Sequence, residues 1–153
     1  MEPEQVARRF FEELWNERRL EAADELIATD CVTHQLRSAV GPAPSAPRGP
    51  EALKEHIRTW LIAFPDLRWE IEASVADDDR VVTWATAHGT HDGMWQGIPP
   101  TGREIVIRSV VMHRIVAGQI REDWVVTEAL GVYQQLGIVP PTPTLLQRAN
   151  TAQ

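Results

Sequence analysis

Apolar residues recur at helical spacing through the first third of the chain, and this pattern predicts three helices. The first spans residues 3–18, opens with a proline and carries one apolar stripe. That stripe consists of Val6, Phe10, Phe11, Leu14 and Trp15. A short second helix is expected over about 20–28. A third is expected over 50–64, beginning at one proline and ending before another.

From residue 68 onward, apolar and polar residues alternate, which is typical of strands with one buried face. The expected strands lie at 68–75, about 80–91, 103–116 and 119–128. Ala117-Gly118 indicates a tight hairpin between the last two strands. A short helix near 129–136 and a Pro-rich tail over 139–153, expected to be ordered only in part, complete the chain.

Three segments lack a regular pattern. Residues 30–34 indicate a brief strand or a turn, and residues 37–50, with four prolines and two glycines, predict a surface loop. Residues 89–102 contain four glycines and two prolines and predict a long connection between strands that carries a Trp and a His. A connection of this length inside a compact domain is usually functional or covers a sheet edge.

Helices followed by a long antiparallel sheet indicate an α+β domain, which we place at residues 1–138, with the tail outside it. The strands should curl into a cone-shaped α+β barrel, in which the N-terminal helices cover a curved antiparallel sheet and leave an interior cavity. Apolar residues on the outer sheet face would remain in water, so we expect a homodimer through that face. They are Val106, Val110 and Met112, with Arg108 and Arg114 beside them.

Composition narrows the class of partner. The 153 residues carry a net charge of −7, which argues against nucleic acid, because phosphate binding needs a basic face. No apolar run approaches the about 18 residues that cross a membrane, so no membrane partner is expected. The acidic start lacks the features of a secretion signal, and the single cysteine, Cys31, suits a reducing compartment. We therefore expect a cytoplasmic location.

Polar residues within apolar strand faces are the first candidates for chemistry, since a buried polar group needs a partner or a purpose. Ser109 and His113 interrupt the apolar face of the strand 103–116. On the last strand Asp123 and Glu128 lie on opposite faces, and alternation alone leaves open which face is inward. Desolvation would make the inward carboxylate a better base near neutral pH. Each of these residues can equally be a satisfied core or surface group.

The pattern predicts no metal site. His88 and His91 are three positions apart on a strand and point to opposite faces, and no carboxylate or cysteine cluster completes a ligand set. Six tryptophans are many for this length. They either pack the core or line a cavity for an apolar, ring-shaped ligand, and both interpretations stay open.

Short motifs spread over nearly the whole chain carry a family resemblance. They are Gly49-Pro50-Glu51-Ala52-Leu53-Lys54, Ala63-Phe64-Pro65-Asp66-Leu67, Gly89-Thr90-His91, Gly97-Ile98-Pro99-Pro100-Thr101-Gly102, Gly118-Gln119-Ile120 with Glu122 and Trp124, and Gln134-Gln135-Leu136-Gly137. With these motifs the chain resembles the SnoaL-like polyketide (ester) cyclases of the nuclear transport factor 2-like superfamily. The resemblance implies the α+β barrel and a cofactor-free reaction, in which an acid/base carboxylate promotes intramolecular aldol ring closure.

The resemblance also implies positions within the pocket. It places the acid/base carboxylate where this chain has Val125, and the partner histidine where it has Val111. The chain therefore departs from the typical cyclase at both positions. His34 matches a position that often faces the pocket in similar proteins.

The leading hypothesis is a cofactor-free enzyme of cyclase, isomerase or dehydratase type acting on a small hydrophobic molecule. Glu128 or Asp123 would remove a proton beside a carbonyl group, with His34 or His113 assisting. The expected substrate-binding residues are Trp15, Trp60, Trp84, Ser109, Val111, Trp124 and Val125. The alternative is a domain that binds an apolar ligand without turning it over. A buried carboxylate within hydrogen-bond reach of a histidine in the cavity would favour the enzyme.

Overall fold

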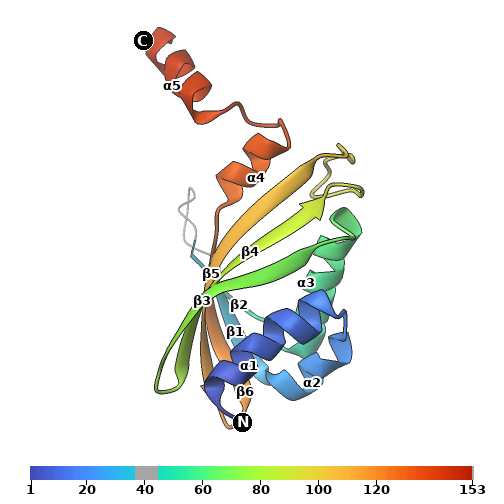
Figure 1. The fold of residues 1–153 in the computed structure, drawn as a ribbon, viewed down its shortest axis with the longest axis vertical. Coiled ribbons are helices and arrows are strands. Elements are labelled where there is room, and N and C mark those ends of the chain that lie inside the picture. Colours follow the sequence, from blue (N-terminus) through green and yellow to red (C-terminus); the bar gives the residue numbers. More distant parts are fainter. Residues whose placement is uncertain (37–44, 153) are drawn as a thin grey trace.

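The computed structural model describes residues 1–36 and 45–152, and Figure 1 shows a curved sheet with helices packed against it. One sheet has the strand order β2-β1-β6-β5-β4-β3. Its strands are β1 (Ile27–Gln35), β2 (Ser45–Pro47), β3 (Arg68–Asp77), β4 (Arg80–Thr90), β5 (Glu104–Val116) and β6 (Gln119–Thr127). The helical elements are α1 (Pro3–Arg9), the π-helix η1 (Phe10–Asn16), the 3₁₀-helix η2 (Leu20–Ala22), α2 (Ala23–Leu26), α3 (Pro50–Ala63), α4 (Ala129–Gln135) and α5 (Thr142–Thr151).

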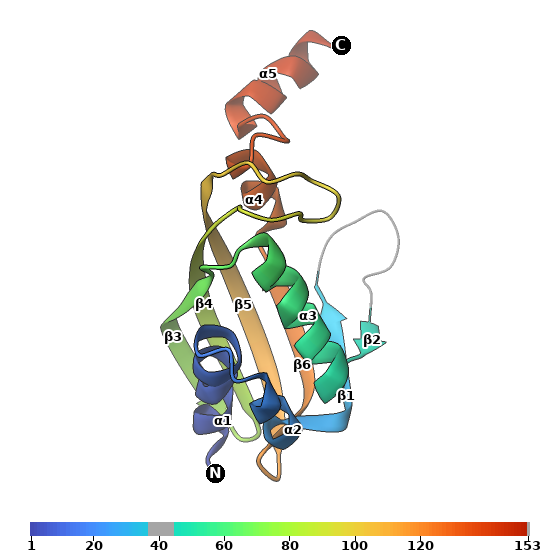
Figure 2. The ribbon, with the colours of Figure 1, turned by 90° about the vertical axis from the view of Figure 1, so that its right-hand side faces the viewer.

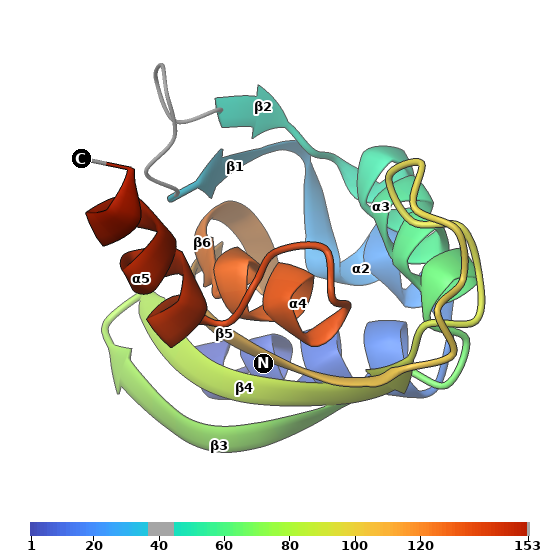
Figure 3. The ribbon, with the colours of Figure 1, turned by 90° about the horizontal axis from the view of Figure 1, so that it is seen from above.

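The expected α+β fold with a curved sheet and N-terminal helices is confirmed. Figure 2 shows α1 and α3 lying across one face of the sheet, and Figure 3 shows the strands curving around the helices. The sheet does not close into a full barrel, since β2 and β3 remain its edges. Side chains on the concave face of the sheet therefore pack against the helices that cross this face.

One strand pair departs from the antiparallel pattern, because β1 runs parallel to β6. The second helix ends at Leu26, and Ile27 pairs with Ile120 near the start of β6. The chain therefore enters both strands from the same end of the sheet. The brief strand or turn expected at 30–34 is part of this nine-residue strand.

The first helix is not a regular α-helix over its whole length. After Arg9 it continues as a π-helix, in which the Glu17 backbone N–H donates to the Glu12 carbonyl oxygen at 2.8 Å. π-Helical segments are rare in proteins, and those that occur are often found at functional sites. The wider turn holds all four apolar side chains of the segment in the core: Phe10, Phe11, Leu14 and Trp15.

The Gly/Pro-rich connection between β4 and β5 folds back onto the end of α3. The backbone N–H groups of Asp92 and Gly93 both donate to the Ala63 carbonyl oxygen, at 3.0 and 3.1 Å. These bonds satisfy a helix-end carbonyl that has no partner within its own helix. They also carry Trp95, which is 4% exposed, into the core.

Two further expectations concern the C-terminal tail and the loop over residues 37–50. The Pro-rich tail contains α5, which has no buried residue and extends beyond α4 in Figure 1. The loop expected over 37–50 includes β2, while residues 37–44 lie outside the described residues. Over the described ranges, no helix has both the length and the apolar character needed to span a membrane.

Replacing Gly93 with alanine should destabilise the fold. A Cβ atom there would lie 1.9 Å from the Ile62 carbonyl oxygen, so the connection would have to move off α3. We expect a loss of about 1–3 kcal/mol in the free energy of unfolding, measured by chemical denaturation. Gly97→Asn is the control, since position 97 lies in open space and asparagine tolerates its positive φ. Equal stability of the two variants would contradict the prediction.

Candidate active site

An interior cavity of about 200 Å³ lies between the concave face of the sheet and the helices η1, α3 and α4. Its exposed lining residues Leu36, Gln96 and Ala129 form the rim, so the cavity opens at the α4 end of the molecule. The lining includes six of the predicted site residues: Trp15, Trp60, Ser109, Val111, Asp123 and Val125.

Aromatic rings form much of the cavity wall. Trp60 and Trp95 have ring centroids 5.5 Å apart, and Trp95 stacks on Tyr133 at the same separation. Tyr133 donates a hydrogen bond from its hydroxyl to Gln96 Oε1 at 3.0 Å, which ties α4 to the rim. Trp69 also lines the cavity, and its Nε1 has no hydrogen-bond partner among the described residues. The wall therefore offers stacking surfaces for a planar ligand.

Asp123 supplies a carboxylate to this aromatic cavity. The residue is 6% exposed, and its Oδ1 has no hydrogen-bond partner within residues 1–36 and 45–152. Burial raises the pKa of the Asp123 carboxyl, and the neighbouring Thr33 side chain and then the positive charge of Arg48 partly oppose this effect. The carboxylate is thus desolvated, and one of its oxygens is left for a ligand.

His113 pairs with Asp123 across β5 and β6 but lies behind the cavity wall. Its ring packs edge-on against Phe10, with centroids 4.7 Å apart. Neither ring nitrogen has a hydrogen-bond partner in the described part of the chain, and burial lowers the pKa of His113 to about 3. The imidazole is therefore neutral near pH 7, and no hydrogen bond joins it to Asp123.

Ser109, Val111 and Val125 lie on the same concave face. The Ser109 hydroxyl donates to the Val126 carbonyl oxygen at 3.1 Å, so it is already satisfied by the backbone. Val111 and Val125 are direct cross-strand partners, and both line the cavity. The two positions that the resemblance gives to a histidine and a carboxylate are thus adjacent and apolar here.

His34 lies on the outer face of the sheet and does not line the cavity. The parallel register pairs Thr33 with Asp123, so Thr33 faces inward and His34 outward. His34 Nε2 is 2.7 Å from Glu122 Oε2, and the imidazole stacks on Trp124, with centroids 5.2 Å apart. His34 therefore faces outward and does not occupy the pocket position that the resemblance implied.

The remaining predicted residues also lie outside the cavity. Trp84, on β4, is 47% exposed. Trp124 is held on the outer face of β6 by the same alternation that turns Asp123 inward. Glu128 is exposed just beyond the end of β6. Alternation on β6 thus decides between the two carboxylates, and Asp123 is the inward one.

Two basic residues of the lining were not expected from the sequence. His56 lies one turn before Trp60 on α3, and burial lowers its pKa to about 4. Helical spacing from the apolar stripe could have identified it. Arg48 precedes α3, and its backbone N–H donates to the Cys31 carbonyl oxygen at 2.7 Å. Its place depends on pairing between β1 and β2, for which the local sequence gives no signal.

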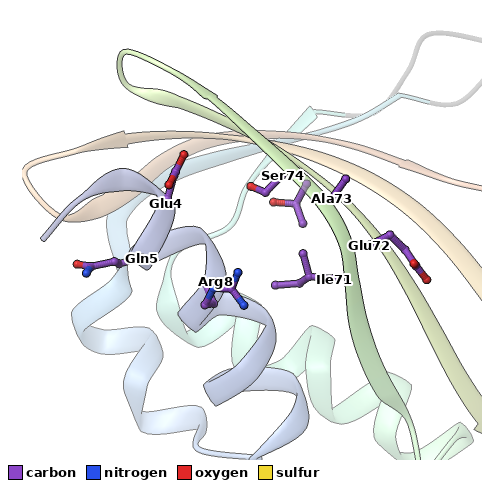
Figure 4. Close-up of a pocket in the computed structure, with 8 residues that line it drawn as sticks. Glu4, Gln5, Arg8, Ile71, Glu72, Ala73 and Ser74 are labelled. Carbon is purple, nitrogen blue, oxygen red and sulfur yellow. The ribbon is translucent and has the colours of Figure 1, made fainter.

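A separate groove runs between α1 and β3, and Figure 4 shows the polar side chains that surround it, including Glu4, Arg8 and Glu72. None of the predicted site residues lines this groove. Over the described residues, no group of three or more His, Cys, Asp or Glu side chains is arranged to hold a metal ion.

An α+β fold whose curved sheet and N-terminal helices enclose a cavity is typical of the nuclear transport factor 2-like superfamily. The family model of the SnoaL-like polyketide cyclases matches residues 5–136, and the chain belongs to this family.

The relatives include two named cyclases. One is aklanonic acid methyl ester cyclase DnrD of Streptomyces peucetius, 37% identical over 103 residues that cover 63% of this chain and 67% of that protein. The other is aklanonic acid methyl ester cyclase DauD of Streptomyces sp. (strain C5), 38% identical over 100 residues that cover 63% of this chain and 60% of that protein.

Similar solved structures extend the likeness over most of the chain. IdmH of Streptomyces antibioticus, a proposed polyketide cyclase, is 31% identical with a TM-score of 0.76, covering 90% of this chain and 99% of its own. AclR of Streptomyces galilaeus, a proposed hydroxylase, is 26% identical with a TM-score of 0.77, covering 98% of this chain and 91% of its own.

Acid should destabilise the protein partly through His113. The unfolded chain protonates this residue below about pH 6.5, whereas the folded chain does so only near pH 3, so the unfolded state binds more protons between these values. The free energy of unfolding should therefore fall with decreasing pH, and His113 contributes up to about 1.4 kcal/mol per pH unit. Denaturation of a His113→Leu variant at several pH values should show a shallower slope.

The matched control for this slope is His88→Gln, because His88 is an exposed histidine on β4. It should keep the pH dependence of the unsubstituted protein. A His113→Leu slope that is as steep as that of the control would rule out the buried, neutral imidazole as a cause of acid sensitivity.

Proposed function

We propose that the protein is a ring-closing enzyme that uses Asp123 as its acid/base group and needs no cofactor. The observation that carries this proposal is a buried carboxylate with a raised pKa in the wall of an aromatic cavity. A carboxylate in such a place accepts a proton near neutral pH more readily than an exposed one. Membership of the cyclase family and the likeness to two aklanonic acid methyl ester cyclases support this choice.

The proposed chemistry is an intramolecular aldol addition on a polyketide ester. Asp123 takes a proton from the carbon next to a carbonyl, and the C–H electron pair becomes the C=C bond of an enolate. That carbon attacks a second carbonyl of the same molecule, forming the new C–C bond and an alkoxide. The alkoxide takes the proton back from Asp123, so the product is an isomer of the substrate and the carboxylate is restored.

The valines at positions 111 and 125 are compatible with this reaction. Val111–Val125 and His113–Asp123 are successive inward pairs of β5 and β6. A carboxylate and an imidazole thus lie one pair farther from the rim than the positions that the resemblance implies. The reacting carbon would have to sit correspondingly deeper in the cavity.

Cavity volume limits how much of a substrate can be enclosed. About 200 Å³ is less than the roughly 300–1,000 Å³ of pockets that enclose drug-sized ligands. A fused multi-ring polyketide would therefore insert only its reacting end, with the remaining rings passing the rim at Leu36 and Gln96. A substrate with fewer rings would be enclosed entirely.

Binding of an apolar ligand without turnover is the second candidate function. The apolar pair Val111–Val125 and the absence of a hydrogen bond between His113 and Asp123 in the described structure favour it. This candidate predicts saturable binding of the same polyketide esters with no conversion.

Replacing Asp123 with asparagine should abolish most of the ring closure. The amide keeps the size of the side chain but cannot take up the substrate proton, so turnover should fall about 10²–10⁴-fold. The measurement is conversion of aklanonic acid methyl ester, followed by liquid chromatography. The folded state of the variant is checked by its thermal unfolding.

Glu128→Gln is the matched control, since Glu128 is the alternative carboxylate, follows the end of the same strand and lies outside the cavity. It should turn over the ester at the rate of the unsubstituted protein. Loss of turnover in Glu128→Gln but not in Asp123→Asn would overturn the assignment. Binding of the ester without conversion by any of the three proteins would favour the second candidate function.

We also propose that two copies associate through the outer face of the sheet. Trp84, Val110 and Val126 align across β4, β5 and β6 and are 47%, 43% and 44% exposed. A contiguous apolar row of this kind is costly in water, and a second copy presents the same row. Arg108 and Arg114 lie on this face. Arg114 contacts Glu122 of its own chain at 3.3 Å, and Arg108 would meet acidic residues of the partner.

Val110→Glu should convert the dimer into a monomer, because the carboxylate would be placed in the centre of the shared apolar row. The molar mass is measured by light scattering at micromolar concentration. Ile62→Glu, an exposed apolar residue of α3 outside the sheet, should leave the dimer intact. A monomeric unsubstituted protein would contradict the proposed association.

A further inference from the structure

Arg48 places a guanidinium group in the wall of the cavity. The residue joins the edge strand β2 to α3, and its backbone N–H is fixed to Cys31, so the side chain starts from a rigid position. The cavity lining includes Arg48 together with Asp123 and His56. Burial lowers the pKa of Arg48 below its ordinary value, but arginine remains charged at any pH at which the protein is folded.

No carboxylate compensates this charge by direct contact. Within residues 1–36 and 45–152 Arg48 forms no ion pair, although more exposed arginines such as Arg8 and Arg121 do. Residues 37–44 contain no Asp or Glu, so they cannot supply a carboxylate side chain. Asp123 acts on Arg48 only over a longer distance. Among the described residues the guanidinium has no hydrogen-bond partner either. A half-buried cation in this situation is costly, and a ligand that accepts from its donors would offset that cost.

His56 does not compensate the charge either. Its imidazole is held among the aromatic rings of Trp15 and Trp60, at centroid distances of 6.1 and 6.5 Å. It is neutral near pH 7, because burial lowers its pKa to about 4. Arg48 is consequently the positive group of the cavity lining, in a protein whose net charge is −7. An anion would find attraction at this point of the molecule and repulsion over much of its surface.

We propose that Arg48 forms an anion subsite within the cavity and selects planar aromatic ligands that carry an ionised oxygen, such as a carboxylate, a phenolate or an enolate. The guanidinium would hold this oxygen while the aromatic wall of Trp60 and Trp95 holds the ring. Guanidinium groups bind such oxygens through short, charge-assisted hydrogen bonds with defined geometry.

This subsite rests on the proposed function only for its catalytic consequence. When Asp123 removes a proton beside a carbonyl, negative charge moves to the carbonyl oxygen. An oxygen held at Arg48 would develop that charge next to a fixed cation, which stabilises the enolate more than the neutral ketone. The cavity would then separate the two tasks, with Asp123 taking the proton and Arg48 holding the oxygen.

The test compares two ligands that differ only in charge, 2-naphthoate and 2-naphthamide, near neutral pH by isothermal titration calorimetry. The unsubstituted protein should bind the naphthoate at least about tenfold more tightly than the amide. In Arg48→Gln this preference should fall to about twofold or less, while the affinity for the neutral amide stays the same. Unchanged amide binding shows that the cavity of the variant is intact.

Two more variants separate the subsite from general electrostatics. Arg58→Gln removes an exposed arginine of α3 and the same net charge, and it should retain the preference. Asp123→Asn removes the opposing negative charge of the cavity and should tighten naphthoate binding. A preference that survives in Arg48→Gln, or that is lost equally in Arg58→Gln, would overturn the subsite, as would failure of naphthoate to bind the unsubstituted protein.

The outcome is independent of ring closure. A naphthoate preference that depends on Arg48, in a protein that converts no polyketide ester, would leave the subsite standing and remove the proposed enzyme. Conversion of the ester without such a preference would do the reverse.

Discussion

The register of β6 between β1 and β5 decides which side chains of this protein can meet. Side chains alternate along a strand, so Asp123 and Val125 face the cavity while Glu122 and Trp124 face outward. A slip by one residue would reverse every one of these positions. The parallel pairing with β1 then carries His34 to the outer face beside Trp124. The cavity lining and the outer contact of His34 with Glu122 therefore lie on opposite faces of the same pair of strands.

Periodicity was sufficient to predict the main elements, because each long strand and helix has one face in the core. It recovers β3 to β6 and α3 to within a few residues. It misses the π-helical turn in the first helix, since Phe10, Phe11, Leu14 and Trp15 fit an α-helical stripe as well. It also shortens β1, whose parallel partner β6 lies some ninety positions later in the chain and leaves no local signal.

The residues of the candidate site were likewise only partly predictable from the sequence. Trp15, Trp60, Ser109 and Val111 were accessible from alternation and helical spacing, because their neighbours on the same face are apolar. The choice between Asp123 and Glu128 required the register of β6, which local sequence does not contain. His34 was misplaced for a related reason, since a resemblance transfers a position but not the direction of its side chain. The position of Arg48 depends on the pairing of β1 with the edge strand β2, which no periodic pattern in the sequence predicts.

Polar atoms without partners gather around the cavity. Within the described residues they include Asp123 Oδ1, Trp69 Nε1 and both ring nitrogens of His113. Each such group lowers stability relative to an apolar side chain of similar size, because it has lost water and gained no hydrogen bond. A core selected only for stability would not place several of them on and behind one wall. Polar groups that lower stability and line a cavity are most simply explained by a ligand that supplies the missing partners.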